Sequence, residues 1–170
     1  EKENTVLCIG RIGFIKNQLN LIRAINDTNV RLKIIGKPAP NHQAYYELCK
    51  KEAKENVEFV GHIDKHQIIK ELDKAKVHVL PSWFETTGLS TIEAAARGCN
   101  VVITKKGDTE EYFKDYAFYC NPGNPDSIRN TILEALEAPV KNDLREFVSN
   151  HYTWKETAKK TYEAYIKVLN

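Results

Sequence analysis

Residues 77–96 read VHVLPSWFETTGLSTIEAAA, and this stretch decides the fold. Its first four residues form an apolar alternating run, which predicts a short buried strand that Pro81 ends. From Leu89 onward, apolar residues recur at helical spacing, which predicts a helix. The N-terminus of such a helix offers unpaired N–H groups and a partial positive charge to an anion.

Two carboxylates bracket the turn between this strand and this helix. Glu85 lies in the loop and Glu93 in the early part of the helix, with seven residues between them. Carboxylate oxygens accept hydrogen bonds from sugar or ribose hydroxyls. The stretch therefore predicts a site for a ligand that carries both an anionic group and hydroxyls.

Length and composition bound the class of protein. A chain of 170 residues is long enough for one domain with its own core, and contents of 42% hydrophobic and 28% charged residues exclude global disorder. The net charge of +2 gives no reason to expect nucleic acid as a partner, and no apolar run has the length of a membrane span. Because the chain starts in a strand-like run and contains no Met, we expect an excised piece of a longer protein without a signal peptide.

We expect neither disulfides nor a metal site. His62 and His66 are four residues apart, as in a metal-binding pair on a helix, but Asp64 is predicted to begin a helix between them. The cysteines show no paired spacing, so buried free thiols in a reducing, cytoplasmic compartment are expected for Cys8, Cys49, Cys99 and Cys120.

Strand-like and helix-like segments alternate along the whole chain. Strands are expected at 5–10, 30–36, 57–60, 77–80, 100–104 and 117–120. Helices are expected at 17–27, 43–55, 68–74, from 89, at 124–138 and at 153–169. This alternation predicts a Rossmann-like α/β domain with a doubly wound, parallel, six-stranded sheet, whose ligand crevice lies at the carboxyl ends of the strands.

Pairs of residues three apart predict the starts of three helices. These pairs are Asp64 with Gln67, Asp108 with Glu111, and Thr153 with Glu156. The last of these helices has Trp154, Tyr162 and Tyr165 on its apolar side, and we expect these side chains to be packing residues.

The segment GRIGFIKNQ, residues 10–18, places Arg11 and Lys16 after the first strand. Arg can bind phosphate oxygens through two hydrogen bonds, while Lys acts as a mobile point charge. The third glycine of a dinucleotide-binding fingerprint is missing. Because the strand ends meet at one edge of the sheet, both cations are expected near Glu85 and Glu93.

Three segments resemble one family. PSWFETTGLSTIEAAARG resembles the E-x7-E signature of retaining family 4 glycosyltransferases of GT-B fold, although Thr86 and Thr87 replace a frequent Gly-Phe. GRIGFIKNQ resembles the family's GR-x4-K segment, and VEFVGHI at 57–63 resembles the segment that lines its nucleobase pocket. The resemblance spans roughly residues 6–136.

This resemblance implies a role for each matching residue. Arg11, Lys16 and Glu85 would be catalytic, with the two cations on the donor diphosphate and Glu85 on the transferred sugar. Glu93 would hold the ribose. The remaining donor-binding residues would be Gly10, Gly61, His62, Ile63, Thr87, Gly88, Leu89 and Ser90, which approach the donor largely through their backbone.

By the same resemblance, residues 1–170 are the C-terminal donor-binding half of a GT-B enzyme. Such an enzyme transfers a hexose from a UDP-, GDP- or ADP-sugar to a saccharide or lipid acceptor, in surface polysaccharide or glycolipid synthesis. No cofactor or metal is expected. The partner is the chain's own N-terminal acceptor domain, which part of the last helix is expected to contact, and membrane contact is expected only through that domain.

Other functions leave part of the pattern unexplained. A sugar-nucleotide epimerase of GT-B fold would share the phosphate site but not the E-x7-E spacing. A flavodoxin-like binding or regulatory module would need acidic residues after the first strand, where this chain has Arg11. A glycosidase could use Glu85 and Glu93 as an acid/base pair, which gives the two cations no role.

Overall fold

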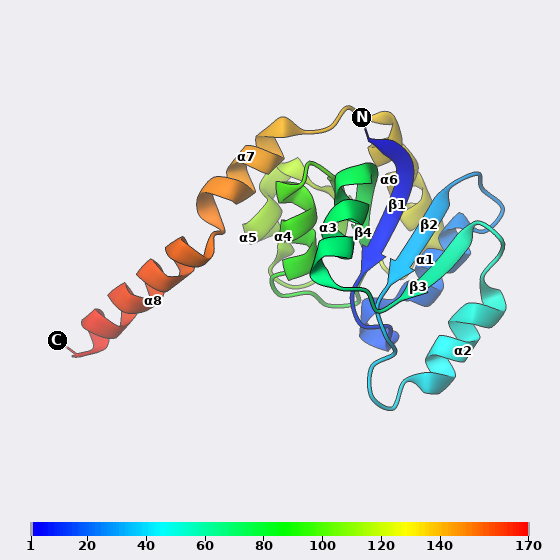
Figure 1. Ribbon diagram of the computed structural model, residues 1–170, viewed down its shortest axis with the longest axis horizontal. Coiled ribbons are helices and arrows are strands. Elements are labelled where there is room, and N and C mark those ends of the chain that lie inside the picture. The colour runs from blue at the N-terminus through cyan, green and yellow to red at the C-terminus, as the bar shows by residue number, and fades with distance from the viewer. Residues whose placement is uncertain (1, 170) are drawn as a thin grey trace.

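The computed structural model describes residues 2–169, and its centre is a parallel six-stranded sheet (Figure 1). The strands are β1 (Glu3–Ile9), β2 (Arg31–Ile35), β3 (Val57–Gly61), β4 (Ala75–Leu80), β5 (Asn100–Thr104) and β6 (Phe118–Cys120). Their order in the sheet is β3-β2-β1-β4-β5-β6, and each neighbouring pair is parallel. This is the strand order of a Rossmann fold, so the predicted fold class is confirmed.

The composition of each strand fits its place in the sheet. Central strands are covered on both faces, which requires near-continuous apolar runs. In β5, for example, every residue is buried, whereas the edge strand β3 has no fully buried residue. The buried strands meet the apolar helix faces in two hydrophobic clusters, one on each face of the sheet.

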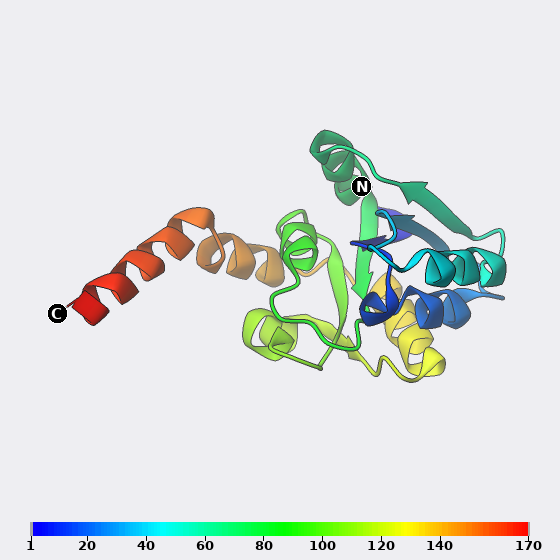
Figure 2. The same cartoon turned by 90° about the horizontal axis from the view of Figure 1, so that it is seen from below.

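Helices cover both faces of the sheet (Figure 2). Helices α1 (Gln18–Ile25), α2 (Gln43–Glu52) and α6 (Pro125–Glu137) contribute to the larger cluster, while α3 (Lys65–Lys74) and α4 (Leu89–Ala96) contribute to the smaller one. The short α5 (Thr109–Phe113) joins β5 to β6. Two 3-10 turns, Phe14–Lys16 and Lys114–Tyr116, complete the connections before α7 (Asn142–His151) and α8 (Trp154–Leu169).

The C-terminal helices differ most from the prediction. The sequence pattern did not predict α7, which buries only Leu144 and Val148. Helix α8 was predicted, but it extends away from the body and buries none of its residues (Figure 1). Trp154 is 80% exposed, and Tyr162 and Tyr165 are each 66% exposed. The prediction that these aromatic residues pack is therefore wrong within residues 2–169, because only the first turn of α8 lies near α4 and the rest of the helix extends away from the body.

All three predicted helix starts are confirmed, and two of the three predicted side-chain caps are present. Asp64 and Gln67 form a reciprocal capping box at α3, and the Thr153 hydroxyl accepts the Glu156 N–H at 3.1 Å. Asp108 is the N-cap residue of α5 but makes no side-chain cap, so the predicted capping box is wrong at this helix. A side-chain cap needs an extended backbone, whereas Asp108 has φ −98° and ψ 12° because its segment is held in a turn against Glu85.

All four cysteines are buried free thiols, as predicted. Burial raises the pKa of Cys8 and of Cys120 to about 12, so neither is a thiolate near neutral pH. Across residues 2–169, no helix combines the length and the apolar character that crossing a bilayer requires.

Candidate functional site

Glycines form the carboxyl edge of β1, β2 and β3. The Gly10 N–H donates to the Ile35 carbonyl at 3.0 Å, and the Gly36 N–H donates to the Gly61 carbonyl at 2.8 Å. A Cβ on Gly36 would lie only 1.9 Å from the Gly10 carbonyl oxygen, so no other residue fits there. The three turns therefore form a tight backbone surface without side chains, which a ligand can approach closely.

Lys16 and Glu85 meet at this edge although they are 69 residues apart. The Lys16 Nζ lies 2.6 Å from the Glu85 Oε2, and the Ser82 hydroxyl donates to the same oxygen at 3.1 Å. Glu85 is only 7% exposed, so it is not an ordinary loop carboxylate. The structure thus joins two of the three predicted catalytic residues in one partly buried ion pair, beside which a ligand would find both a cation and a hydroxyl acceptor.

Buried amides hold the loop that carries Lys16. Asn17 has φ 60°, and its Nδ2 donates to the carbonyls of Pro81 and Pro122 at 2.9 and 2.8 Å. The Gln18 side chain accepts the Gly13 N–H and donates to the Arg11 carbonyl. Sequence reasoning missed both residues as positioning groups. Their only signal was an adjacent Asn-Gln directly after Lys16.

A second loop fixes the backbone of Glu85. The Glu85 N–H donates to the Lys106 carbonyl at 3.0 Å, and the Asp108 N–H donates to the Glu85 carbonyl at 3.1 Å. A Cβ on Gly107 would lie 2.0 Å from the Glu85 carbonyl oxygen. The close approach of Gly107 therefore sets the position of Glu85, and the sequence prediction did not include this contact.

The N-terminus of α4 is open toward the same edge. Gly88 is its N-cap residue with φ 64°, and no side chain caps it. Within residues 2–169, the amides of Leu89 and Ser90 have no hydrogen-bond acceptor. The Ser90 hydroxyl donates instead to the Ile9 carbonyl at 3.0 Å, which ties α4 to the end of β1. Free amides and the helix dipole together suit an anion.

Two cavities meet at Glu93. The larger, of about 510 Å³, has His62, Ile63 and Glu93 in its lining, so the predicted nucleobase and ribose residues lie together between α3 and α4. The smaller, of about 300 Å³, contains Thr87 and Leu89 as well as Glu93.

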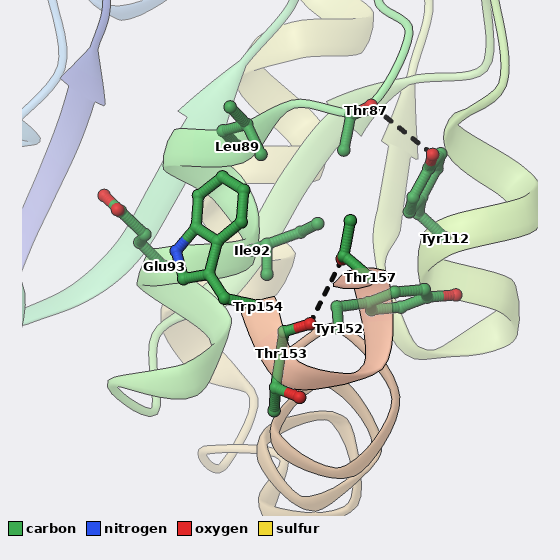
Figure 3. Close-up of a pocket in the computed structure, with 9 residues that line it drawn as sticks. All are labelled: Thr87, Leu89, Ile92, Glu93, Tyr112, Tyr152, Thr153, Trp154 and Thr157. Atoms are coloured by element: carbon green, nitrogen blue, oxygen red, sulfur yellow. Dashed lines mark hydrogen bonds between the residues drawn. The ribbon is translucent and has the colours of Figure 1, made fainter. Parts of the chain in front are cut away.

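Figure 3 shows the smaller cavity, which α4 shares with the start of α8. Tyr112, Tyr152 and Trp154 surround it, and the Thr87 hydroxyl lies 3.4 Å from the Tyr112 hydroxyl. The carboxylate of Glu93 points away from Tyr112 and Thr87. This cavity was not predicted from the sequence.

Arg11 remains separate from these groups. Its side chain is exposed and makes no ion pair or hydrogen bond to any residue from 2 to 169. It follows Gly10 directly at the end of β1, so it provides an uncompensated cation at the same edge as the Lys16–Glu85 pair.

Several known proteins are similar to this chain in sequence. An uncharacterized glycosyltransferase of Methanocaldococcus jannaschii is 29% identical over 97% of this chain and 45% of its own length. Glycogen synthase of Mycobacterium tuberculosis is 24% identical over 95% of this chain and 42% of its own length. The chain thus spans just under half the length of these relatives.

Solved structures agree in fold. The Anabaena protein HepE, in complex with UDP and glucose, superimposes with a TM-score of 0.88 at 19% identity, covering 98% of this chain and 49% of HepE. Sucrose-phosphate synthase of Thermosynechococcus elongatus superimposes with a TM-score of 0.84 at 22% identity, covering 98% of this chain and 46% of its own. The chain therefore has the fold of one half of a GT-B glycosyltransferase.

A family model described as glycosyl transferases group 1 matches residues 1–154, which is nearly the whole chain. Because this match includes every strand of the sheet and both loops that carry Lys16 and Glu85, the chain belongs to the glycosyl transferases of group 1.

Proposed function

We propose that this chain is the donor-binding half of a retaining glycosyltransferase that transfers a hexose from a nucleoside diphosphate sugar. The observation that carries the proposal is the Lys16–Glu85 ion pair beside the uncapped N-terminus of α4, close in the fold to the cavity of His62, Ile63 and Glu93. The groups proposed to bind the sugar, the diphosphate and the nucleoside of one donor then lie along a single edge of the sheet. The solved HepE complexes with UDP and UDP-glucose support a donor of this class.

The proposed reaction depends on charge. As the sugar departs, negative charge grows on the leaving phosphate, and preorganised cations and N–H groups stabilise that charge. Arg11, Lys16 and the free amides of Leu89 and Ser90 would supply this stabilisation, so a divalent metal has no necessary role. Glu85 would accept hydrogen bonds from sugar hydroxyls, and Glu93 from the ribose.

The proposed enzyme also has an N-terminal half, which is not part of these 170 residues. An N-terminal half would bind the acceptor, a saccharide or a lipid, in surface polysaccharide or glycolipid synthesis. The full enzyme would act in the cytoplasm and touch the membrane only through that half. The chain alone would bind a UDP-, GDP- or ADP-sugar without transferring it.

Calorimetric titration with UDP, GDP and ADP tests the donor site. We expect at least one nucleotide to bind the wild-type chain and Arg11→Ala to weaken that binding about tenfold, because one uncompensated cation is lost. Arg31→Ala is the matched control, since this exposed arginine begins β2 at the opposite edge of the sheet. The proposal fails if no nucleotide binds, or if both substitutions weaken binding equally.

A further inference from the structure

Four large apolar side chains are exposed next to the Lys16–Glu85 pair. Phe14 and Ile15 precede Lys16 and are 59% and 55% exposed, while Trp83 and Phe84 precede Glu85 and are 36% and 55% exposed. We call these four residues the aromatic patch. Large apolar side chains that are exposed on a surface often mark a contact site, and each of these four leaves more than a third of its surface uncovered within residues 2–169.

Contacts with the body hold two rings of the patch in place. The Trp83 N–H donates to the Ile15 carbonyl at 2.8 Å, which joins its two segments. The rings of Phe14 and Trp83 lie 6.3 Å apart at an interplanar angle of 19°, so their faces are nearly parallel. The far edge of the Trp83 ring packs against Gly123, and the Phe14 ring meets Tyr45 edge to face. A platform ordered before binding loses little entropy when a ligand arrives.

The patch is continuous with the proposed donor site. Phe84 is the residue before Glu85, and Ile15 is the residue before Lys16, so the two segments that carry the patch lead directly into the ion pair. If Glu85 holds the transferred sugar, a molecule bound on the patch would lie next to the segments that hold it. This argument rests on the proposed function of Lys16 and Glu85.

We propose that the aromatic patch binds the acceptor by stacking a neutral saccharide ring on its aromatic faces. Aromatic faces carry partial negative charge and attract the polarised C–H bonds on one side of a sugar ring. The patch contains no charged side chain, so it offers nothing specific to an anionic group. It also lacks the cluster of basic residues that binding to an anionic lipid surface requires. The donor half thereby contributes to acceptor specificity.

Tryptophan fluorescence can test this proposal. The chain has only two tryptophans, so Trp154→Phe leaves Trp83 as the single reporter. This variant would be titrated with methyl glycosides and disaccharides of glucose, galactose and mannose, with and without UDP, GDP or ADP. We expect at least one saccharide to change the Trp83 emission in a saturable way. Phe14→Ala and Phe84→Ala should raise its Kd about fivefold or more.

Two further variants make the test specific. Phe84→Leu keeps an apolar side chain of similar size but removes the ring, so stacking predicts a weaker saccharide complex and an unchanged nucleotide Kd. Leu133→Ala, an exposed apolar residue on α6, is the matched control and should change neither Kd.

Three results would overturn the inference: no saccharide changes the emission, Phe84→Leu binds saccharides as the parent does, or only detergent and lipid vesicles change the emission. If a nucleotide still binds in any of these cases, the donor-site proposal stands although the inference fails. Loss of both kinds of binding would overturn the donor site as well.

Discussion

Glu85 combines a low exposure, an ion pair and a fixed backbone in one residue. Its carboxylate is held by Lys16 and Ser82, and its main chain by Lys106 and Asp108. A carboxylate fixed in this way can select a ligand by its hydroxyl groups, because its position is set before binding. A substitution of Glu85 alone can therefore test its role in the proposed donor site.

Glu85→Gln should separate sugar recognition from nucleotide recognition. The amide keeps the shape of the side chain but loses the charge that strengthens hydrogen bonds from sugar hydroxyls. We expect the affinity for a nucleoside diphosphate sugar to fall about tenfold, and that for the matching nucleoside diphosphate to change little. Calorimetry measures both. Glu110→Gln, which breaks the exposed pair with Lys105, is the control, and an equal loss for both ligands would contradict a sugar-facing Glu85.

His78 predicts a pH dependence of stability. It is fully buried in β4, and neither ring nitrogen has a hydrogen-bond partner within residues 2–169. Burial lowers its pKa from 6.5 to about 3, so the folded chain holds the neutral ring. Below pH 6.5 the unfolded chain binds a proton that the folded chain does not, and the free energy of unfolding decreases as pH falls toward 3.

The decrease should amount to about 1.6 kcal/mol between pH 6.5 and pH 5, because the slope rises from half its full value at pH 6.5 toward about 1.4 kcal/mol per pH unit. Urea unfolding at several pH values measures it. His78→Leu should remove this part of the slope, whereas His66→Leu, at an exposed position, should retain it. An unchanged slope in His78→Leu would show that other groups cause the pH dependence.

At the scale of elements, the glycine turns are the most constrained parts of the edge. Gly36→Ala should destabilise the chain by about 2–4 kcal/mol, because the new Cβ would lie 1.9 Å from a backbone oxygen and the turns must separate. Gly61→Ala is the control. That residue has φ +79° but open space around it, so the expected cost is about 1 kcal/mol. Urea unfolding compares the two variants, and similar values would contradict the close approach.

Helix α8 should contribute little to the stability of the body. A truncation after residue 158 keeps Trp154 and Thr157 at the smaller cavity, and no residue of α8 is buried. We expect the free energy of unfolding to change by no more than about 0.5 kcal/mol. Leu144→Ala in α7 is the contrasting variant and should cost about 2–5 kcal/mol, because that side chain is buried. A large loss on truncation would mean that α8 packs on the body.

The spacing of apolar residues was sufficient to predict the strands of the sheet, but it did not predict α7 or the exposed position of α8. The first four strands have apolar runs that are bounded by glycine or proline, and these signals are local. Helix α7 buries only Leu144 and Val148, too few positions for a clear period. The apolar side of α8 was predicted, but a helix pattern does not show whether a partner lies within the same chain. Asp108 matched a capping pattern whose outcome depended on the distant Glu85.

For the whole molecule, the carboxyl edge of the sheet was predictable and its internal contacts were not. The alternation of strands and helices places Arg11, Lys16, Glu85 and Glu93 on one edge, whatever the conformations of the loops that carry them. Which of them pair depends on contacts between loops that are far apart in sequence. The Lys16–Glu85 bond, the Gly107 approach and the Asn17 amide bonds are all of this kind.

A cavity lies at each end of the strands, and the two cavities suit different kinds of ligand site. A polar cavity of about 610 Å³ lies at the amino ends of β1–β3, with Thr5, Arg31 and Glu58 in its lining. Volume alone would favour this cavity over the one beside Glu93. The free amides of Leu89 and Ser90 and the Lys16–Glu85 pair lie at the carboxyl edge, and we therefore propose that the donor binds there.

Nitrogen-15 amide spectra of the chain, titrated with the nucleoside diphosphate that binds most tightly, test this placement most directly. The account predicts that the amide signals of His62, Ile63, Leu89 and Ser90 shift in a saturable way, while those around the amino-edge cavity stay in place. Shifts concentrated at the amino-edge cavity, or no saturable shift at the N-terminus of α4, would contradict it.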